Sequence, residues 1–180
     1  MDMNIIQIVF SSTGGTQKAA DMITSAWDIP VRKVDLSDLE TDFSAVSLEK
    51  DDVAVIAVPS FGGRVPAPAI ERLEEINENP EALPAPQIPG NRPYKKAGSG
   101  LIPKADRSCT GCGLCARNCP VQAISRENLK DTDSKKCISC MRCVAKCPQL
   151  ARKVNGAMVK AVGLALKKAC SERKGNELFI

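Results

Sequence analysis

Apolar runs and amphipathic stretches alternate through the first half of the chain. Residues 4–10 (NIIQIVF), 31–36 (VRKVDL) and 53–58 (VAVIAV) are rich in β-branched residues and predict three strands. Residues 17–27 and 67–76 show the apolar spacing of helices. The first helix is expected to bury a face formed by Ala19, Ala20, Ile23 and Trp27. This order of strands and helices predicts an α/β fold with right-handed crossovers. The unbroken apolar run at 53–58 predicts a strand buried on both faces.

The pattern changes after this region, and the chain divides into four expected parts. Residues 1–78 form the α/β part, residues 79–103 a linker rich in proline and glycine, residues 104–150 a cysteine-rich domain, and residues 151–180 a tail. The apolar spacing in the tail predicts a helix over residues 154–173. Its apolar stripe consists of Val154, Met158, Ala161, Val162, Ala165 and Ala169. We expect the stripe to dock on the protein, with partner docking and an in-plane membrane helix as alternatives.

The same cysteine pattern occurs twice in the cysteine-rich domain, and each copy ends in Cys-Pro. The first run comprises Cys109, Cys112, Cys115 and Cys119. The second run comprises Cys137, Cys140, Cys143 and Cys147. Soft thiolates select zinc, copper(I) or iron–sulfur clusters. Such runs ligate two [4Fe–4S] cubanes, and the fourth cysteine of each run binds the other cluster.

Each cluster is therefore expected to take three ligands from one run and one from the other. Cluster one would be held by Cys109, Cys112, Cys115 and Cys147. Cluster two would be held by Cys137, Cys140, Cys143 and Cys119. The alternative is a pair of structural zinc sites, whose cysteine pairs are usually separated by a longer loop. Neighbouring cations are expected to favour the reduced clusters: Arg117, Lys136, Arg142 and Lys146.

Composition and charge restrict the possible functions. The chain has no histidine and only six aromatic residues, which excludes a histidine base and disfavours nucleic-acid stacking. Residues 1–90 carry a net charge of −9 and residues 91–180 a net charge of +13, so we expect redox partners with an acidic docking surface. No signal peptide or spanning apolar stretch is visible, and disulfides are therefore not expected. The clusters indicate a cytoplasmic protein of an organism that limits oxygen, such as an anaerobe.

A small polar loop follows the first predicted strand and precedes a helix. Its residues are Ser11, Ser12, Thr13, Gly14, Gly15 and Thr16. Backbone N–H groups at such a position favour an anion. The loop is neither an ATP-binding loop nor a dinucleotide fingerprint, and the alternative is a tight turn that binds nothing.

The spacing Ser11-x-Thr13-Gly14-x-Thr16 resembles the phosphate loop of flavodoxins. Together with the double cysteine motif, it resembles the family of flavodoxin-domain-fused 2[4Fe–4S] ferredoxins. Further likeness lies in residues 61–66, 89–95 and 170–179. The resemblance implies FMN bound by the loop at 11–16, with Phe61 as the stacking residue. It implies an α/β plus α+β fold class: a partial flavodoxin-like parallel βαβ sheet, a bacterial-type dicluster ferredoxin domain and a C-terminal helix.

The chain departs from a flavodoxin in one respect. A flavodoxin-like sheet has five strands, whereas only three are visible before the prolines, and a segment is missing between about Glu74 and Pro84. The strand at 53–58 would then form an exposed edge, which predicts association and a homo-oligomer. The ninth cysteine, Cys170, is expected to be a small buried apolar residue on the tail helix.

Three functions remain after these observations. The first is an electron carrier, which needs no acid, base or nucleophile and is not an enzyme. The second is an FMN-dependent reductase supplied by its own clusters. The third is a module in which the clusters sense oxygen or iron.

Overall fold

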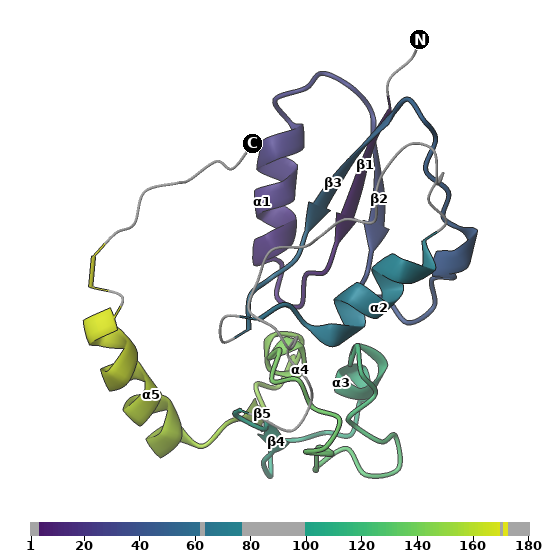
Figure 1. Cartoon of the computed structure of the whole chain (residues 1–180). Coiled ribbons are helices and arrows are strands. Elements are labelled where there is room, and N and C mark those ends of the chain that lie inside the picture. The colour runs from purple at the N-terminus through teal and green to yellow at the C-terminus, as the bar shows by residue number, and fades with distance from the viewer. Residues whose placement is uncertain (1–3, 62–63, 77–99, 170, 173–180) are drawn as a thin grey trace.

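The computed structural model describes residues 4–61, 64–76, 100–169, 171 and 172. The protein combines helices with a small parallel sheet (Figure 1). The sheet has the order β2-β1-β3, with Ile5 opposite both Val31 and Val53. Its strands are β1 (Asn4–Val9), β2 (Val31–Asp35) and β3 (Asp52–Ala57). The three predicted strands are thus confirmed to within one residue at each end.

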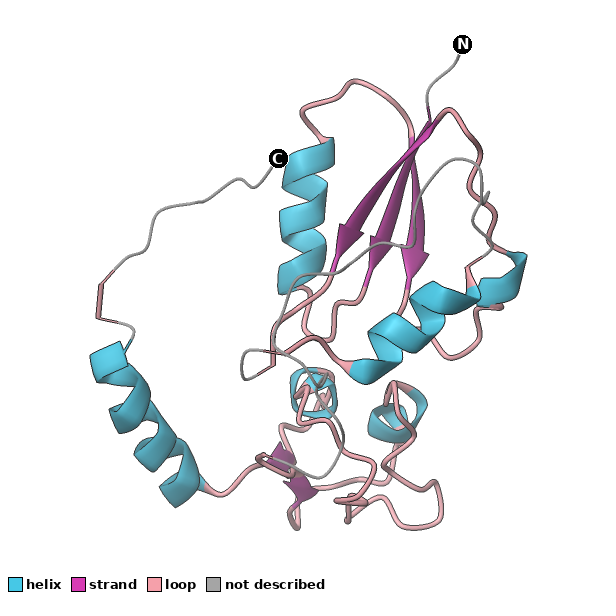
Figure 2. Ribbon diagram, in the orientation of Figure 1, coloured by secondary structure: helices cyan, strands magenta, loops and turns pink. Residues whose placement is uncertain are grey.

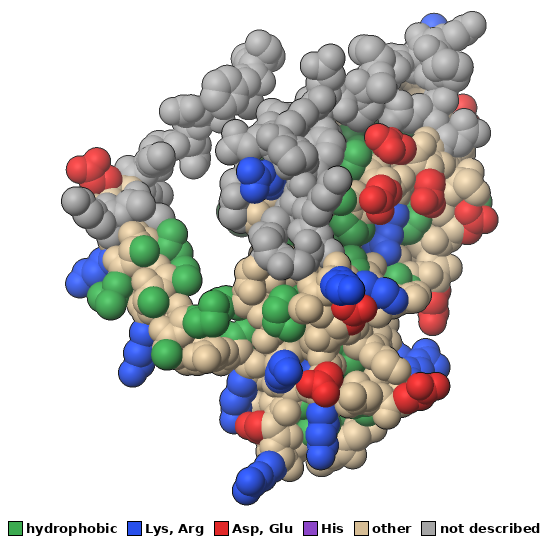
Figure 3. All heavy atoms as spheres, turned by 60° about the horizontal axis from the view of Figure 1, so that its bottom comes forward, with side chains coloured by type: hydrophobic (Ala, Val, Ile, Leu, Met, Phe, Trp, Pro, Cys, Tyr) green, Lys and Arg blue, Asp and Glu red, His purple; other side chains and the backbone are tan. Residues whose placement is uncertain are grey.

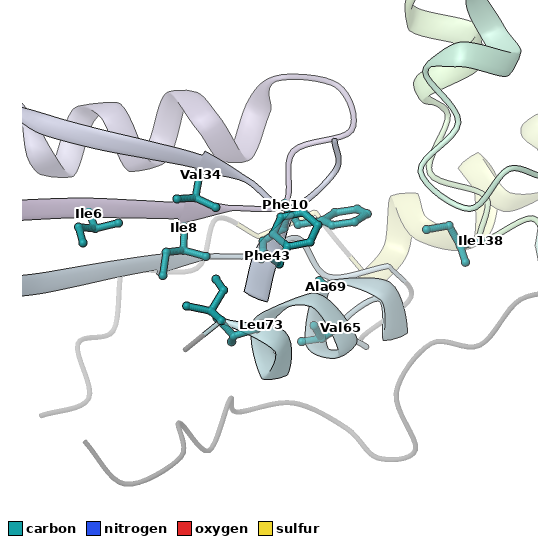
Figure 4. Close-up of a cluster of buried hydrophobic side chains, with 11 residues drawn as sticks. Ile6, Ile8, Phe10, Val34, Phe43, Val65, Ala69, Leu73 and Ile138 are labelled. Atoms are coloured by element: carbon teal, nitrogen blue, oxygen red, sulfur yellow. The ribbon is translucent and has the colours of Figure 1, made fainter. Parts of the chain in front are cut away.

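Helices cover both faces of this sheet. Figure 4 shows α1 (Gly15–Thr24) and α2 (Ala67–Glu75) on opposite sides of the strands. A short 3-10 helix, η1 (Phe43–Ala45), packs beside α2. The main apolar core lies between the sheet and this pair. It includes Ile6, Ile8, Phe10, Val34, Leu36, Phe43, Ala69 and Leu73.

The predicted buried face of α1 is wrong, although the helix itself is present. Ala20 is buried as expected, but Ala19 is exposed, and Ile23 and Trp27 are 53% and 41% exposed. The cause is a buried polar residue of β1, Gln7, which faces the helix. Its side-chain amide donates to Thr24 Oγ1 over 2.5 Å and accepts from Gln17 Nε2 over 2.8 Å. Because a buried amide must be hydrogen-bonded, the helix turns Thr24 inward in place of its apolar residues.

The prediction that residues 53–58 are buried on both faces is also wrong. Most of β3 is only half-buried, and Val53 is 36% exposed. Within the described part of the chain, β3 pairs with β1 alone and has no strand on its outer side. The strand therefore lies at an edge of the described sheet, as the missing fourth and fifth strands predicted.

The cysteine-rich domain extends through residue 153, slightly past its predicted end at 150. Its ends are joined by the antiparallel pair of β4 (Lys104–Ala105) and β5 (Arg152–Lys153). Two four-residue helices, α3 (Leu114–Arg117) and α4 (Arg142–Ala145), each begin within a cysteine run. Four of the seven residues in its buried cluster are cysteines, so thiols make up most of this small core.

The last helix, α5 (Gly156–Ala169), lies within the predicted range but is not docked. Figure 2 shows α5 standing apart from the rest of the protein. Four residues of its apolar stripe are exposed, namely Met158 at 51%, Ala161, Val162 and Ala165. The expected docking of the stripe on the protein is therefore wrong among the described residues. No described helix meets the length and apolarity needed to cross a membrane. Cys170 and most of the linker lie outside the described residues.

The cysteine-rich domain packs against the carboxyl ends of the three strands (Figure 1). Ile138, from the second cysteine run, is 2% exposed and belongs to the core of the sheet (Figure 4). Arg72 of α2 donates from Nη1 to Leu36 O over 2.5 Å and from Nη2 to Pro120 O over 2.7 Å. One guanidinium thus joins the end of β2 to the first cysteine run.

Replacing Arg72 with methionine is expected to lower the free energy of unfolding of the loaded protein by about 2–4 kcal/mol. The substitution removes two charge-assisted hydrogen bonds to carbonyl oxygens that lie at the contact between the sheet and the cysteine-rich domain. Denaturant unfolding measures the change. Arg32→Met is the matched control, because Arg32 donates one hydrogen bond, to Ser47 O, on the exposed surface. Equal effects of the two substitutions would contradict the assigned role of Arg72.

Candidate metal centre

The two cysteine runs adopt the same local structure with an offset of 28 residues, from 109 to 137 and from 112 to 140. Helices α3 and α4 keep this offset. The residues with positive φ also form pairs that are 28 positions apart. These pairs are Gly111 with Ser139, Gly113 with Met141, and Gln122 with Leu150. Non-glycine residues seldom adopt such angles. The second run therefore keeps the loop shape of the first, although Ser139 and Met141 stand where the first run has two glycines.

Backbone N–H groups point at the sulfur atoms. Ala123 N donates to Cys119 Sγ over 3.2 Å, and its counterpart Ala151 N donates to Cys147 Sγ over 3.3 Å. Ser139 N donates to Cys137 Sγ over 3.4 Å. Such N–H···S bonds stabilise a thiolate more than a thiol and tune the potential of a bound cluster.

Three cysteines of the first run share a hollow with one cysteine of the second run. This hollow is lined by Cys109, Cys112, Cys115 and Cys147. Cys112 is exposed, so the hollow reaches the surface. No three metal-binding side chains of the described residues converge closely enough to hold a single ion. Four cysteines around one hollow supply the number of thiolates that a cubane takes.

The remaining four thiols form a second, more buried group. Burial raises the pKa of Cys143 to about 12, Arg152 opposes this rise, and the neighbouring Cys140, Cys119 and Cys137 add to it. Burial likewise raises the pKa of Cys137 and of Cys140. The structure therefore brings Cys119 to the second run, as it brings Cys147 to the first. Thiolates packed together in this way are stable only when a positively charged core binds them.

The polar loop at 11–16 faces the cysteine-rich domain. Ser11 Oγ accepts from Gln17 N over 3.1 Å, and Ser11 O accepts from Arg142 Nη1 over 3.3 Å. Ser12 is 5% exposed, and among the described residues its hydroxyl has no hydrogen bond of good geometry. It nevertheless lies near enough to Cys140 to lower the pKa of that thiol, against the larger raising effect of burial.

These contacts bear on the expected flavin site. Parallel sheets bind ligands beyond the carboxyl ends of their strands, and here the cysteine-rich domain covers that edge (Figure 1). Gly14 has φ 91° and precedes α1, as a tight turn requires. The other residues of the turn, Thr13, Gly15 and Thr16, are exposed or half-buried. Phe61 is partly buried against the core of the sheet. FMN at this loop stays a prediction.

Sequence reasoning missed one charged residue. Arg142 is the charged residue that sequence reasoning did name. It donates to Ser11 O and Ser37 Oγ and lies 3.9 Å from the carboxylate of Asp35. Arg152, which it did not name, is 2% exposed and lines the first hollow. The repeat offers a signal that could have found it. The residue 28 positions earlier is Ile124, so Arg152 is a charged residue at a position where the first run has an apolar one.

Comparison with known proteins agrees with this geometry. Residues 108–151 match the family model of the 4Fe-4S dicluster domain. This segment is an iron–sulfur, ferredoxin-like domain. Its boundaries enclose all eight cysteines of the two runs. The ferredoxin-like domain supports iron–sulfur electron transport as the chemistry of the chain.

A curated relative supports the same conclusion. Over 44 residues the chain is 48% identical to one component of the ion-translocating oxidoreductase complex of Methanosarcina acetivorans. The match covers 24% of this chain and 17% of the relative, so the chain spans less than a fifth of that protein. No solved structure matches the chain. The likeness to this relative therefore concerns about a quarter of the chain, and the flavodoxin resemblance has no support from these comparisons.

Proposed function

We propose that the protein is a one-electron carrier that holds two [4Fe–4S] clusters with crossed ligation. Cluster one takes Cys109, Cys112, Cys115 and Cys147, and cluster two takes Cys137, Cys140, Cys143 and Cys119. The observation that carries the proposal is the position of Cys147, whose thiol lines the hollow of the first-run thiols. The grouping of Cys119 with the second run supports it independently.

The solvent exposure of the two cysteine groups indicates which cluster exchanges electrons with a partner. Cluster one lies near the surface, since Cys112 is exposed, whereas Cys119, Cys137 and Cys143 are buried. Electrons therefore exchange with a partner most readily at cluster one, and cluster two acts as the inner site. When bound, the clusters supply the one-electron chemistry, and the chain supplies ligation, N–H···S bonds and charge.

The surface around cluster one fits an acidic redox partner. Figure 3 shows lysine and arginine side chains over the lower part of the molecule, with some acidic side chains between them. Two lysines of this domain have acidic partners: Lys104 lies 3.2 Å from Asp131, and Lys153 lies 2.5 Å from Asp106. Arg107 is exposed two residues before Cys109. Exposed pairs of this kind are weak, so an acidic partner can compete for these lysines.

Anaerobic analysis of iron, sulfide and zinc in one pure sample tests the proposal. We expect about eight iron and eight sulfide ions per chain, as two cubanes require. A zinc-loaded sample, or one that reaches only about four irons after reconstitution, would contradict two clusters.

The alternative function is an FMN-dependent reductase, for which the loop at 11–16 is the motivating feature. Flavin analysis of the same sample distinguishes the two: a stoichiometric flavin favours the reductase, and its absence favours the carrier. A homo-oligomer through the open edge of β3 and a cytoplasmic location remain part of the proposal. Sedimentation of the loaded protein tests the first of these.

A further inference from the structure

Ser12, in the polar loop after β1, is a buried hydroxyl residue without a partner among the described residues. Its side chain is 5% exposed, and its Oγ makes no hydrogen bond of good geometry there. The neighbouring Ser11 differs, because its Oγ accepts from Gln17 N over 3.1 Å. A buried polar group without a partner is costly, so a group that binds this hydroxyl is expected when the protein carries its cofactors.

The second cysteine run lies against this loop on both sides of Cys140. Ile138 is 2% exposed in the core of the sheet, and Cys140 itself packs against that core. Arg142 Nη1 donates to Ser11 O over 3.3 Å. Burial raises the pKa of Cys140, while the backbone N–H of Arg142 and the hydroxyl of Ser12 oppose this rise. The hydroxyl therefore lies within reach of the Cys140 sulfur.

Other buried polar atoms without a partner gather around the same cysteines. Four such side-chain atoms occur among the described residues, and they belong to Ser12, Ser139, Arg142 and Arg152. Ser139 and Arg142 flank Cys140 in the sequence, and Arg152 lines the hollow of the other group. The atoms that lack partners thus lie where ligating sulfurs would be, which points to the sulfurs as the missing acceptors.

The chemistry of a bound cluster fixes the direction of the hydrogen bond. A cysteine sulfur bound to iron carries no proton, so it can only accept, and the serine hydroxyl must donate. The equivalent residue of the first run, Cys112, is exposed, and solvent can donate to its sulfur. Cys140 is partly buried against the sheet. A hydroxyl of the protein can therefore take the place that water has at Cys112.

We propose that Ser12 donates a hydrogen bond to the sulfur of Cys140 in the loaded protein and thereby raises the reduction potential of cluster two. The inference rests on the proposed two-cluster function. A donor to a ligating sulfur stabilises the more negative, reduced state of a cluster. The loop after β1 then belongs to the surroundings of an iron–sulfur cluster, and its buried hydroxyl faces a sulfur in place of a phosphate.

Redox titration of the loaded full chain, followed by electron paramagnetic resonance, tests the inference with Ser12→Ala. We expect the reduced-to-oxidised ratio of one cluster to fall about fivefold at a fixed solution potential, as the loss of one hydrogen bond to a charged group allows. For a one-electron couple this corresponds to about 40 mV. The other cluster should keep its potential. Ser25→Ala is the control, because it removes an exposed hydroxyl that donates to Met22 O.

A second pair of variants separates the hydrogen bond from the packing of the side chain. Ser12→Thr and Ser12→Val introduce side chains of nearly the same shape, and only threonine keeps the hydroxyl. We expect Ser12→Thr to stay near the wild-type potentials and Ser12→Val to behave like Ser12→Ala. If Ser12→Ala does not bind its full iron, this pair decides, and better loading or a higher potential of Ser12→Thr supports the inference.

Three results would overturn the inference. The first is a fully loaded Ser12→Ala protein with wild-type potentials. The second is equal behaviour of Ser12→Thr and Ser12→Val in both loading and potential. The third is a Ser12→Ala protein that loses bound flavin while its cluster potentials stay unchanged, since the hydroxyl would then serve a phosphate. Iron counting of the wild type tests the proposed function separately.

Discussion

Removal of iron is expected to unfold residues 104–150 while the three-stranded sheet stays folded. Four of the seven residues in the buried cluster of the ferredoxin-like domain are cysteines, and the others are Ala116, Ala123 and Ile124. Its regular elements are two-residue strands and four-residue helices, which are too short to be stable alone. Metal ligation in small domains contributes on the order of 10 kcal/mol to folding, which exceeds what this core supplies.

Hydrogen exchange with mass spectrometry measures this effect on the two parts of one chain. After anaerobic chelation we expect amides of residues 104–150 to exchange at nearly unprotected rates. Amides of β1 provide the internal control, because Ile6, Ile8 and Phe10 keep their apolar contacts with α2 and η1. Strong protection of Ala123 and Ala151 in iron-free protein would show that the domain folds without its clusters.

Two double substitutions are expected to differ by one whole cluster. In the crossed arrangement Cys109 and Cys147 serve the same cubane, so Cys109→Ser with Cys147→Ser should retain about four irons, the content of one cubane. Cys109 and Cys119 serve different cubanes, so Cys109→Ser with Cys119→Ser should retain almost none. The two variants carry the same number and type of substitutions and share the change at Cys109. The difference between them therefore reports which thiols share a cluster.

Iron and sulfide analysis after reconstitution measures the outcome, and visible absorption confirms that any remaining iron is in a cluster. Uncrossed ligation would give the reverse result, with no iron retained by the first variant and about four irons by the second. A serine oxygen is a harder ligand than a thiolate and does not replace it well. Cys147 is the residue for which this result matters most, since the crossed arrangement assigns it to the cubane of Cys109, from which it is distant along the chain.

The elements that sequence predicted well are those fixed by local pattern. The three strands and the ends of α2 follow from β-branched runs and helical periodicity, which act over a few residues. The cysteine pattern was informative for a different reason, because its spacing is dictated by the size of a cluster. Both kinds of signal are contained within short stretches of chain.

The features that sequence misjudged depend on contacts between distant residues. Ile23 and Trp27 look like a core face, but the buried amide of Gln7 requires Thr24 at that position. The stripe of α5 looks like a docked face, yet nothing in the helix itself specifies what it should meet. Arg152 reads as one more cation in a basic half, and only the fold shows that it is buried beside Cys147. Burial of a polar group cannot be read from its neighbours in the sequence.

The contacts of the ferredoxin-like domain fall at the ends of β1, β2 and α2, through Ser11, Asp35 and Arg72. The outer side of β3 makes none of these contacts and ends the sheet with unpaired backbone groups among the described residues. Strands added there would lengthen the sheet sideways and leave the domain contacts in place. The architecture is therefore modular. New binding surfaces can be built along the outer edge of β3, by fusion or by design, without rebuilding the ferredoxin-like domain.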